Sequence, residues 1–247
     1  MAKKLVALGD GHGIGTAGKE TPNIPELGRK VKENEFNRAV VKFLDVDLKR
    51  CGFDTLLVAP TDADTSLGDR VNLANTKKAD AYVSIHYNAF DGSFGGSNPE
   101  GLSVHIYPNS KEGRKLGTAI LNHLKTGTKQ VNRGLKEANF YVLHHTSMPA
   151  ILSENGFMDN KREALLMLNV DFQKEVAKEH CQGICDYFNI KYVPVVVIPV
   201  VKPVDKTIIA SGTMYRVVTG SFSNRSNAND RIAELKKAGF ESFIAIK

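Results

Sequence analysis

Short apolar runs alternate with amphipathic patterns along the chain from its start to about residue 190. A short apolar run is typical of a buried strand, and apolar positions every three or four residues are typical of a helix on a sheet. The alternation predicts an α/β fold, with an open, twisted, mostly parallel sheet covered by helices on both faces. The predicted strands span residues 5–8, 56–58, 81–85, 102–106, 140–143 and 150–152, and the predicted helices span 33–48, 66–74, 111–125, 162–168 and 172–188.

The composition changes at about residue 192. Valine and proline dominate residues 193–204, and prolines at this spacing exclude an interior strand or helix, so we expect an extended linker over residues 192–210. An edge strand docked on the first domain is the alternative. The predicted domains are therefore 1–191 and 211–247, the second a small β-α-β unit with strands at 214–219 and 242–246 around a helix at 227–238. A unit this small buries little apolar surface, so we expect it to need a partner surface.

Charge and apolar runs restrict the partners. The net charge of +6 favours polyanionic surroundings such as nucleic acid, anionic lipid or an acidic cell wall. Because the sequence has no arginine-rich run and no RNA-binding signature, we predict no nucleic-acid partner. No run approaches the roughly 18 apolar residues of a membrane span, so we predict no membrane insertion. The first apolar run is too short for a signal peptide, so we expect synthesis in the cytoplasm.

The three cysteines do not follow the spacing of a zinc motif. Cys181 and Cys185 lie four residues apart on the apolar face of a predicted helix, so we expect two reduced thiols in the core. Cys51 is isolated in the sequence.

Four residues with acid–base or metal-binding side chains lie where a ligand site is expected. In a doubly wound sheet, ligands bind beyond the carboxyl ends of the strands. His12, His86 and Glu154 each follow a predicted strand, and Glu33 opens the helix after the first strand. Two histidines and one carboxylate are a ligand set for catalytic zinc, and a further carboxylate can accept a proton from water. The four residues together predict a zinc hydrolase site.

Other interpretations of these residues are weaker. Each histidine could be a structural hydrogen-bonding residue, and a glutamate at a helix start is favoured by the helix dipole alone. A nucleotide site in the loop at residues 9–15 is disfavoured, because the loop lacks the third glycine of a dinucleotide motif and the lysine of a phosphate loop. Ser153 lacks the flanking glycines of a serine nucleophile.

Five segments resemble the amidase-3 family, the zinc-dependent N-acetylmuramoyl-L-alanine amidases that include bacterial autolysins and phage endolysins. They follow the family order and are GHG at 11–13, ENEFN at 33–37, DRVNLAN at 69–75, ADAYVSIHYNA at 79–89 and MPAILSENGF at 148–157. The resemblance implies that His12, Glu33 and His86 bind zinc and that Glu154 is the catalytic glutamate. It also implies hydrolysis of the amide between N-acetylmuramic acid and L-alanine in peptidoglycan. Residues 9–10 depart from the family, which usually has Asp-Pro there.

Some assignments stay open at this point. Glu35 is the alternative zinc ligand, but residues two apart on a helix face different ways, so at most one of Glu33 and Glu35 binds the metal. Asn88 follows His86 and is a candidate for substrate binding, with a turn-stabilising role as the alternative. A zinc peptidase that cleaves within the stem peptide and a non-catalytic wall-binding protein are the alternative functions.

The C-terminal residues resemble the SPOR peptidoglycan-binding repeat, through YRVVTGSFS at 215–223 and LKKAGF at 235–240. Only one of the two usual β-α-β halves is present. A single half leaves an unpaired sheet edge, so we expect two chains to pair through this unit as a homodimer. Because the sequence shows no signal peptide and resembles the amidase-3 family, we expect a lytic enzyme that is made in the cytoplasm and acts on the bacterial cell wall after holin- or lysis-dependent release.

Overall fold

The computed structural model describes residues 2–195, 224–237 and 239–240. The chain divides into a larger unit, Met1–Val196, and a smaller unit, Val197–Lys247. Among the described residues, no helix is long and apolar enough to cross a membrane.

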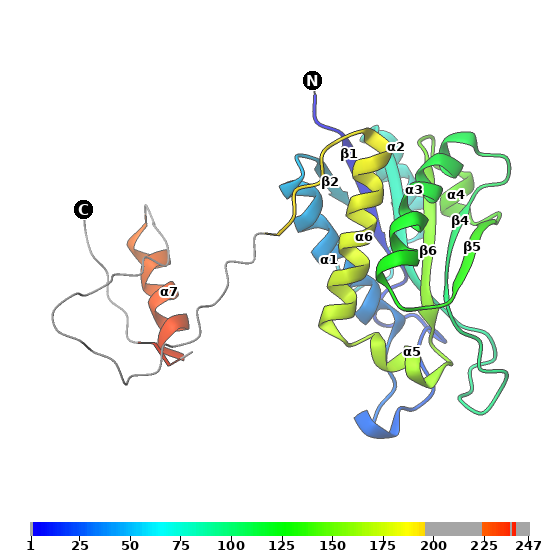
Figure 1. The fold of residues 1–247 in the computed structure, drawn as a ribbon, viewed down its shortest axis with the longest axis horizontal. Helices are drawn as coiled ribbons and strands as arrows, with labels where there is room; N and C mark the ends of the chain where they lie inside the picture. Colours follow the sequence, from blue (N-terminus) through cyan, green and yellow to red (C-terminus); the bar gives the residue numbers. More distant parts are fainter. Residues whose placement is uncertain (1, 196–223, 238, 241–247) are drawn as a thin grey trace. The chain divides into compact units, whose positions relative to one another are not determined.

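A six-stranded sheet forms the centre of the larger unit (Figure 1). Its strands have the order β2-β1-β3-β6-β4-β5, and all neighbours are parallel except β4 and β6, which are antiparallel. This confirms the predicted open, mostly parallel α/β sheet. The strands are β1 Leu5–Asp10, β2 Asp54–Leu57, β3 Ala81–Asn88, β4 Leu102–Ile106, β5 Asn132–Glu137 and β6 Ala150–Phe157.

Helices cover both faces of the sheet, because its central strands are apolar on both sides. Three long helices lie side by side over one face, with α6 between α1 and α3 (Figure 1). Two short helices, α2 and α4, pack on the opposite face. The helices of this unit are α1 Glu33–Arg50, α2 Leu67–Thr76, α3 Lys111–Gly127, α4 Tyr141–His144, α5 Lys161–Leu166 and α6 Val170–Phe188, with a 3-10 turn at Pro25–Leu27.

Capping residues fix where several helices begin. The Ser66 hydroxyl accepts a hydrogen bond from the Asp69 backbone N–H at 3.1 Å, which confirms the predicted start of α2. Ser110 and Asn169 cap α3 and α6 in the same way.

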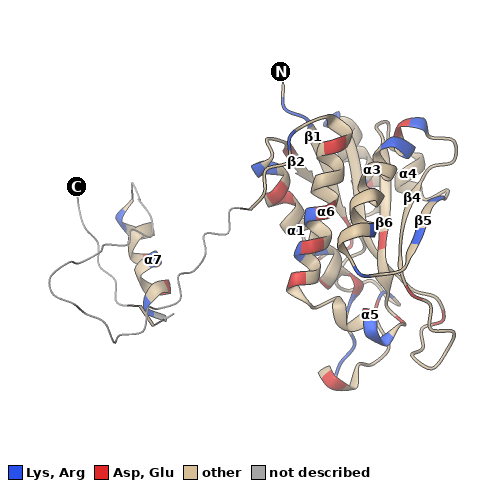
Figure 2. Ribbon diagram, in the orientation of Figure 1, with Lys and Arg blue, Asp and Glu red and all other residues tan. Residues whose placement is uncertain are grey.

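In Figure 2, positive and negative side chains are interspersed on the helices of the larger unit.

One local prediction was wrong, and one strand was missed. Residues 140–143 were expected to form a strand, but Tyr141–His144 is the helix α4, in which Val142 and Leu143 are buried against β6. A short apolar run fits either element, and here packing decides. Strand β5 was not predicted, because its sequence NRGLKE has no apolar alternation. It lies at the sheet edge, where polar residues are tolerated.

The cysteines also differ from expectation. Cys181 and Cys185 are buried free thiols, as predicted, whereas Cys51, which is isolated in the sequence, lies next to them in the fold. Its Sγ lies 3.7 Å from that of Cys181, because the end of α1 packs against α6.

The described part of the smaller unit contains the helix α7, Arg225–Lys237. Gly239 follows with φ +84°, and the backbone N–H groups of Gly239 and Phe240 bond to the carbonyls of Lys236 and Leu235. This is the glycine-terminated helix end that the sequence predicts. The strands predicted at 214–219 and 242–246, and most of the predicted linker, lie outside the described residues.

Candidate metal centre

Three of the predicted ligands meet at the carboxyl edge of the sheet. His12 lies in the loop after β1, Glu33 is the first residue of α1, and His86 lies near the end of β3. Their donor atoms all lie within 4.8 Å of one another. The Glu33 carboxyl is 3.2 Å from His12 Nε2 and 3.1 Å from His86 Nδ1. The structure therefore brings these three side chains together.

The backbone around His12 is held by side chains from two helices. His12 has φ +61°, the left-handed conformation that a residue with a side chain rarely adopts. Its carbonyl accepts hydrogen bonds from Asn34 Nδ2 at 2.8 Å and from Arg70 Nη2 at 3.1 Å. These two bonds offset the cost of this conformation and fix where the His12 ring points.

Gly11 allows the two histidines to approach each other. A Cβ at this position would lie 2.7 Å from His86 Nε2 and closer still to two other atoms of the ring. Position 11 of the GHG segment therefore requires glycine, since the His86 ring occupies the space that a side chain would fill.

Glu33 is held as a carboxylate. It is buried, and its Oε1 accepts hydrogen bonds from the Tyr87 backbone N–H at 3.1 Å and from Asn37 Nδ2 at 3.0 Å. Burial by itself raises the pKa of Glu33, but the hydrogen bonds to His12 and His86 outweigh it and lower the pKa below its ordinary value. An anionic oxygen next to two imidazoles is a donor that a divalent ion accepts.

His86 is oriented by a second partner. Its Nε2 lies 3.1 Å from the Ser84 hydroxyl, so its Nδ1 is the nitrogen that faces Glu33. Burial lowers the pKa of His86, although its bond to Glu33 acts in the opposite direction. Neutral imidazole is the form that binds metals, and a polar partner on the other nitrogen is typical of such ligands. The residues present therefore fit a metal ion of the zinc type.

Glu154 stands beside this donor set. It lies within β6 rather than after it, and it pairs with His86 across β3 and β6, so both side chains lie on the same face. Its Oε2 is buried without a hydrogen-bond partner among the described residues. Burial, and then repulsion from Glu33, raise the pKa of Glu154 well above its ordinary value. Glu154 is thus an acid–base group without a structural partner.

The two alternative site residues have other contacts. Glu35 forms two hydrogen bonds of 2.8 Å with the Arg29 guanidinium and also accepts from the Lys32 backbone N–H, so it caps α1 and is not in the donor set. Asn88 Oδ1 accepts from the backbone N–H of Ala89 at 2.8 Å, which stabilises the turn after β3. A substrate contact of Asn88 stays a prediction.

Sequence reasoning missed a buried charge network beneath the loop. Asp10 is buried, and Arg38 Nε donates to its Oδ2 at 2.9 Å. Arg70 is also buried and donates to the carbonyls of Asp10, His12 and Thr65. A signal was present, because Arg70 lies four residues before Ala74 on the apolar face of α2.

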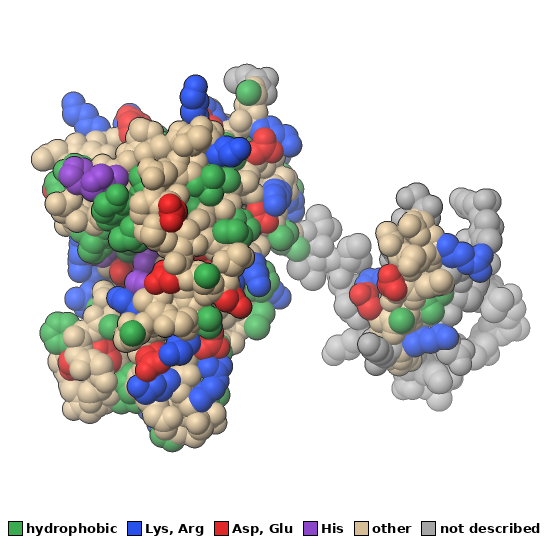
Figure 3. All heavy atoms as spheres, turned by 180° about the vertical axis from the view of Figure 1, so that it is seen from behind, with side chains coloured by type: hydrophobic (Ala, Val, Ile, Leu, Met, Phe, Trp, Pro, Cys, Tyr) green, Lys and Arg blue, Asp and Glu red, His purple; other side chains and the backbone are tan. Residues whose placement is uncertain are grey.

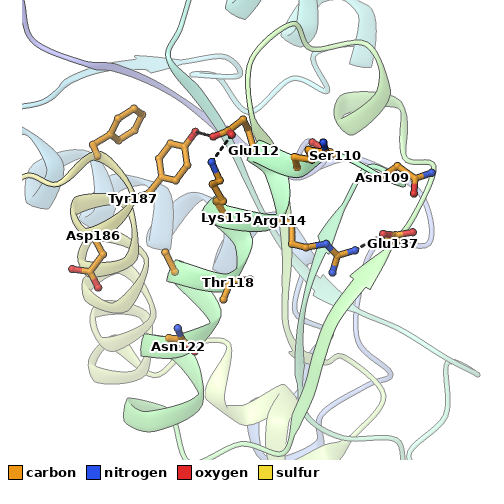
Figure 4. Close-up of a pocket in the computed structure, with 13 residues that line it drawn as sticks. Asn109, Ser110, Glu112, Arg114, Lys115, Thr118, Asn122, Glu137, Asp186 and Tyr187 are labelled. Atoms are coloured by element: carbon orange, nitrogen blue, oxygen red, sulfur yellow. Dashed lines mark hydrogen bonds and ion pairs between the residues drawn. The ribbon is translucent and has the colours of Figure 1, made fainter.

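The donor set lies apart from one broad surface depression. That depression is formed by the first turns of α3 and the end of α6, and the donor residues are not among those that line it (Figure 4). Within it, the Lys115 ammonium and the Tyr187 hydroxyl both donate hydrogen bonds to the Glu112 carboxylate. On the face shown in Figure 3, histidine side chains near the middle of the larger unit lie beside acidic ones, and another group of histidines near the edge lies beside hydrophobic side chains.

A mostly parallel α/β sheet with two imidazoles and a carboxylate at its carboxyl edge, and a second carboxyl beside them, is typical of metal-dependent hydrolases. Residues 6–186 match the Amidase_3 family, described as N-acetylmuramoyl-L-alanine amidase, and residues 192–245 match the SPOR domain. The chain belongs to the N-acetylmuramoyl-L-alanine amidase family. This confirms the resemblance of both regions, and the SPOR match includes the residues predicted as a linker.

Similar proteins agree with this assignment. The chain is 31% identical over 203 residues to a sporulation-specific N-acetylmuramoyl-L-alanine amidase of Bacillus subtilis (strain 168), which covers 79% of this chain and 68% of that protein. It is 35% identical over 190 residues to an endolysin of Bacillus phage SPP1, covering 76% of this chain and 67% of that one. The crystal structure of an N-acetylmuramoyl-L-alanine amidase from Clostridium difficile 630 matches with a TM-score of 0.69 and 29% identity, over 76% of this chain and 98% of that one.

Proposed function

We propose that the chain hydrolyses the amide between N-acetylmuramic acid and L-alanine in peptidoglycan, with zinc held by His12, Glu33 and His86. The observation that carries the proposal is the convergence of these donor atoms within 4.8 Å, in a chain of the amidase family. The unpartnered carboxyl of Glu154 beside them supplies the group that hydrolysis needs in addition to a metal.

When bound, zinc supplies Lewis acidity that polarises the amide carbonyl and makes a water molecule more acidic. Glu154 accepts the proton of the attacking water and returns it to the departing alanine nitrogen. A group that takes and returns a proton works best with a pKa near the working pH, and burial together with Glu33 shifts Glu154 in that direction.

The other residues hold this arrangement in place. Glu33 stays anionic because His12 and His86 bond to it, and Ser84 fixes the ring of His86. Arg70 and Asn34 hold the backbone of His12. A site whose donors are fixed before binding loses little energy to rearrangement when substrate arrives.

The SPOR match supports a binding role for the C-terminal residues. We propose that residues 192–245 hold the enzyme on peptidoglycan and so raise the effective concentration of the scissile amide. The enzyme then acts on the bacterial cell wall after release from the cell that makes it. Pairing of two C-terminal units as a homodimer is part of this proposal, and light scattering of the full chain at micromolar concentration tests it: a dimer supports pairing and a monomer refutes it.

Mass spectrometry of digested sacculi tests the reaction. The proposal predicts released peptides that begin at L-alanine and glycan strands that stay intact. Fragments cut within the stem peptide would show a peptidase, and sacculi left intact by zinc-loaded protein would show a binding protein without this activity.

The variant Glu154→Gln tests the acid–base role. It keeps the size of the side chain but cannot carry the proton, so we expect a loss of turnover of about 10²–10⁴-fold with the metal content unchanged. Glu35→Gln is the matched control, since Glu35 faces away from the donor set and binds Arg29. Turnover by Glu154→Gln at the rate of the control would refute the assigned role.

A further inference from the structure

A second group of metal-binding side chains lies at the other end of α1. Cys51 caps the C-terminus of α1, and Cys181 and Cys185 lie one turn apart on α6. The three Sγ atoms are all within 4.8 Å of one another, and all three cysteines are free and buried. Figure 1 shows α1 and α6 packed side by side, which explains how residues far apart in the sequence meet.

This cluster is separate from the amidase site. Glu33 and Cys51 lie at opposite ends of the 18-residue α1, and at about 1.5 Å per residue they are roughly 27 Å apart. The cluster therefore has no part in amide hydrolysis.

The sulfur spacing fits a shared metal ion. With metal–sulfur bonds of about 2.3 Å, three sulfurs around one ion are about 3.8–4.0 Å apart, from tetrahedral to trigonal geometry. Cys51 Sγ and Cys181 Sγ are 3.7 Å apart, and all three sulfurs lie within 4.8 Å of one another. Small side-chain adjustments would therefore bring the three sulfurs to these distances. A disulfide needs two sulfurs about 2.05 Å apart, much closer than the 3.7 Å between Cys51 and Cys181.

Two hydrogen-bond donors lie at the edge of the cluster. The Val193 backbone N–H points at Cys51 Sγ at 3.3 Å, and Arg50 Nε donates to the Val193 carbonyl at 2.8 Å. The Val193 carbonyl also lies 3.8 Å from Cys51 Sγ, so the backbone of Val193 links the Arg50 guanidinium to the cluster. Val193, whose backbone contacts Cys51, has an exposed side chain.

We propose that Cys51, Cys181 and Cys185 form a second metal site, which takes a soft d10 ion such as Cu⁺, Zn²⁺ or Cd²⁺ through three thiolates. Thiolate sulfur selects ions of this class. On binding, three sulfur–hydrogen bonds break, three sulfur–metal bonds form, and the protons pass to the solvent. The ion joins α6 to Cys51 at the end of α1. Binding to the folded state alone then stabilises the larger unit.

Titration of the full-length, reduced, metal-free protein with Cd²⁺ tests the site. Cadmium bound to thiolates absorbs in the ultraviolet through sulfur-to-metal charge transfer, and cadmium bound to His12, Glu33 and His86 does not. We expect the band to saturate at one equivalent bound by sulfur. The double variant His12→Ala, His86→Ala is the matched control and keeps the full band.

Single Cys→Ser variants test whether all three sulfurs take part. We expect Cys51→Ser, Cys181→Ser and Cys185→Ser each to weaken Cd²⁺ binding at least tenfold, with wall digestion unchanged. The site is overturned if the reduced wild-type protein, with three thiols titrated after unfolding, shows no band at one equivalent. It is also overturned if the band stays unchanged in any of the three variants. The wild-type titration and the histidine control decide the matter even if a serine variant does not fold.

Discussion

Gly11→Ala tests the geometry of the amidase site without removing any group that carries chemistry. The added Cβ would lie 2.7 Å from His86 Nε2 and closer to two further ring atoms, whereas ordinary van der Waals contact begins at 3.4 Å. The backbone cannot retreat freely, because Gly11 N–H bonds to the Ile85 carbonyl at 3.0 Å and its own carbonyl accepts from Asn34 and Asn37. The His86 ring must therefore move by well over half an ångström.

That displacement is large for a metal ligand. Donor positions in metal sites hold to about 0.2 Å, so we expect that a ring displaced this far cannot bind the proposed ion together with Glu33 and His12. Disturbing the support of a ligand costs about 10–100-fold in metal affinity, which is about 1.4–2.7 kcal/mol, and we expect Gly11→Ala to lose at least this much. Turnover falls with the metal content.

Gly15→Ala is the matched control in the same loop. A Cβ there meets no atom within 4 Å, and Gly15 is not among the glycines with positive φ. Metal content after dialysis against buffered zinc, clearing of a sacculus suspension and thermal melting are measured for both variants. We expect the control to match the wild-type protein, and Gly11→Ala to melt as a folded protein with little metal and little activity. Stoichiometric zinc and wild-type clearing in Gly11→Ala would refute the geometric reasoning.

Two further changes test the support of the site and a buried acid elsewhere. Arg70→Lys removes the guanidinium that donates to the carbonyls of Asp10, His12 and Thr65, and lysine cannot bond to all three. We expect zinc affinity, measured by competition with a chelator, to fall 10–100-fold together with activity. Unchanged zinc affinity would contradict this role of Arg70. Glu179 is buried beside Glu175, and burial together with that neighbour raises the pKa of Glu179 to about 9. The folded protein therefore keeps a proton on Glu179 that the unfolded chain releases above pH 4.5. As a result, the free energy of unfolding falls as the pH rises from about 5 to 9. Glu179→Gln removes this loss of stability. In urea unfolding, we expect the free energy of unfolding to fall from pH 5 to pH 9 by at least about 1 kcal/mol less in the variant than in the wild-type protein. An equal pH dependence in both proteins would show that Glu179 is ionised when folded.

The sequence was sufficient to predict the strands and helices that are strongly apolar. Strands β1, β3 and β6 are buried on both faces, and the helices that cover them have a clear apolar stripe, so their alternation was sufficient to predict the sheet. Strand β5 and helix α4 depend on packing instead. Asn132–Glu137 is a polar edge strand, and Tyr141–His144 becomes a helix because two of its residues face β6.

The candidate site shows the same division. The histidines and glutamates at strand ends and at a helix start could be found, because the loops that leave parallel strands gather at the carboxyl edge of the sheet. The position of Glu154 inside β6 could not, since its strand continues through pairing with β3. The approach of Cys51 to Cys181 also depends on tertiary packing, because 130 residues separate them and no local pattern links them.

X-ray anomalous scattering at the zinc edge, from crystals of the full chain grown with zinc, tests the central claim most directly. We expect a peak at the carboxyl edge of the sheet, bonded to His12, Glu33 and His86, with the Glu154 carboxyl next to it but not bonded. No peak at these three residues, or a peak whose ligands include Glu154 in place of Glu33, would contradict the assignment of the donor set.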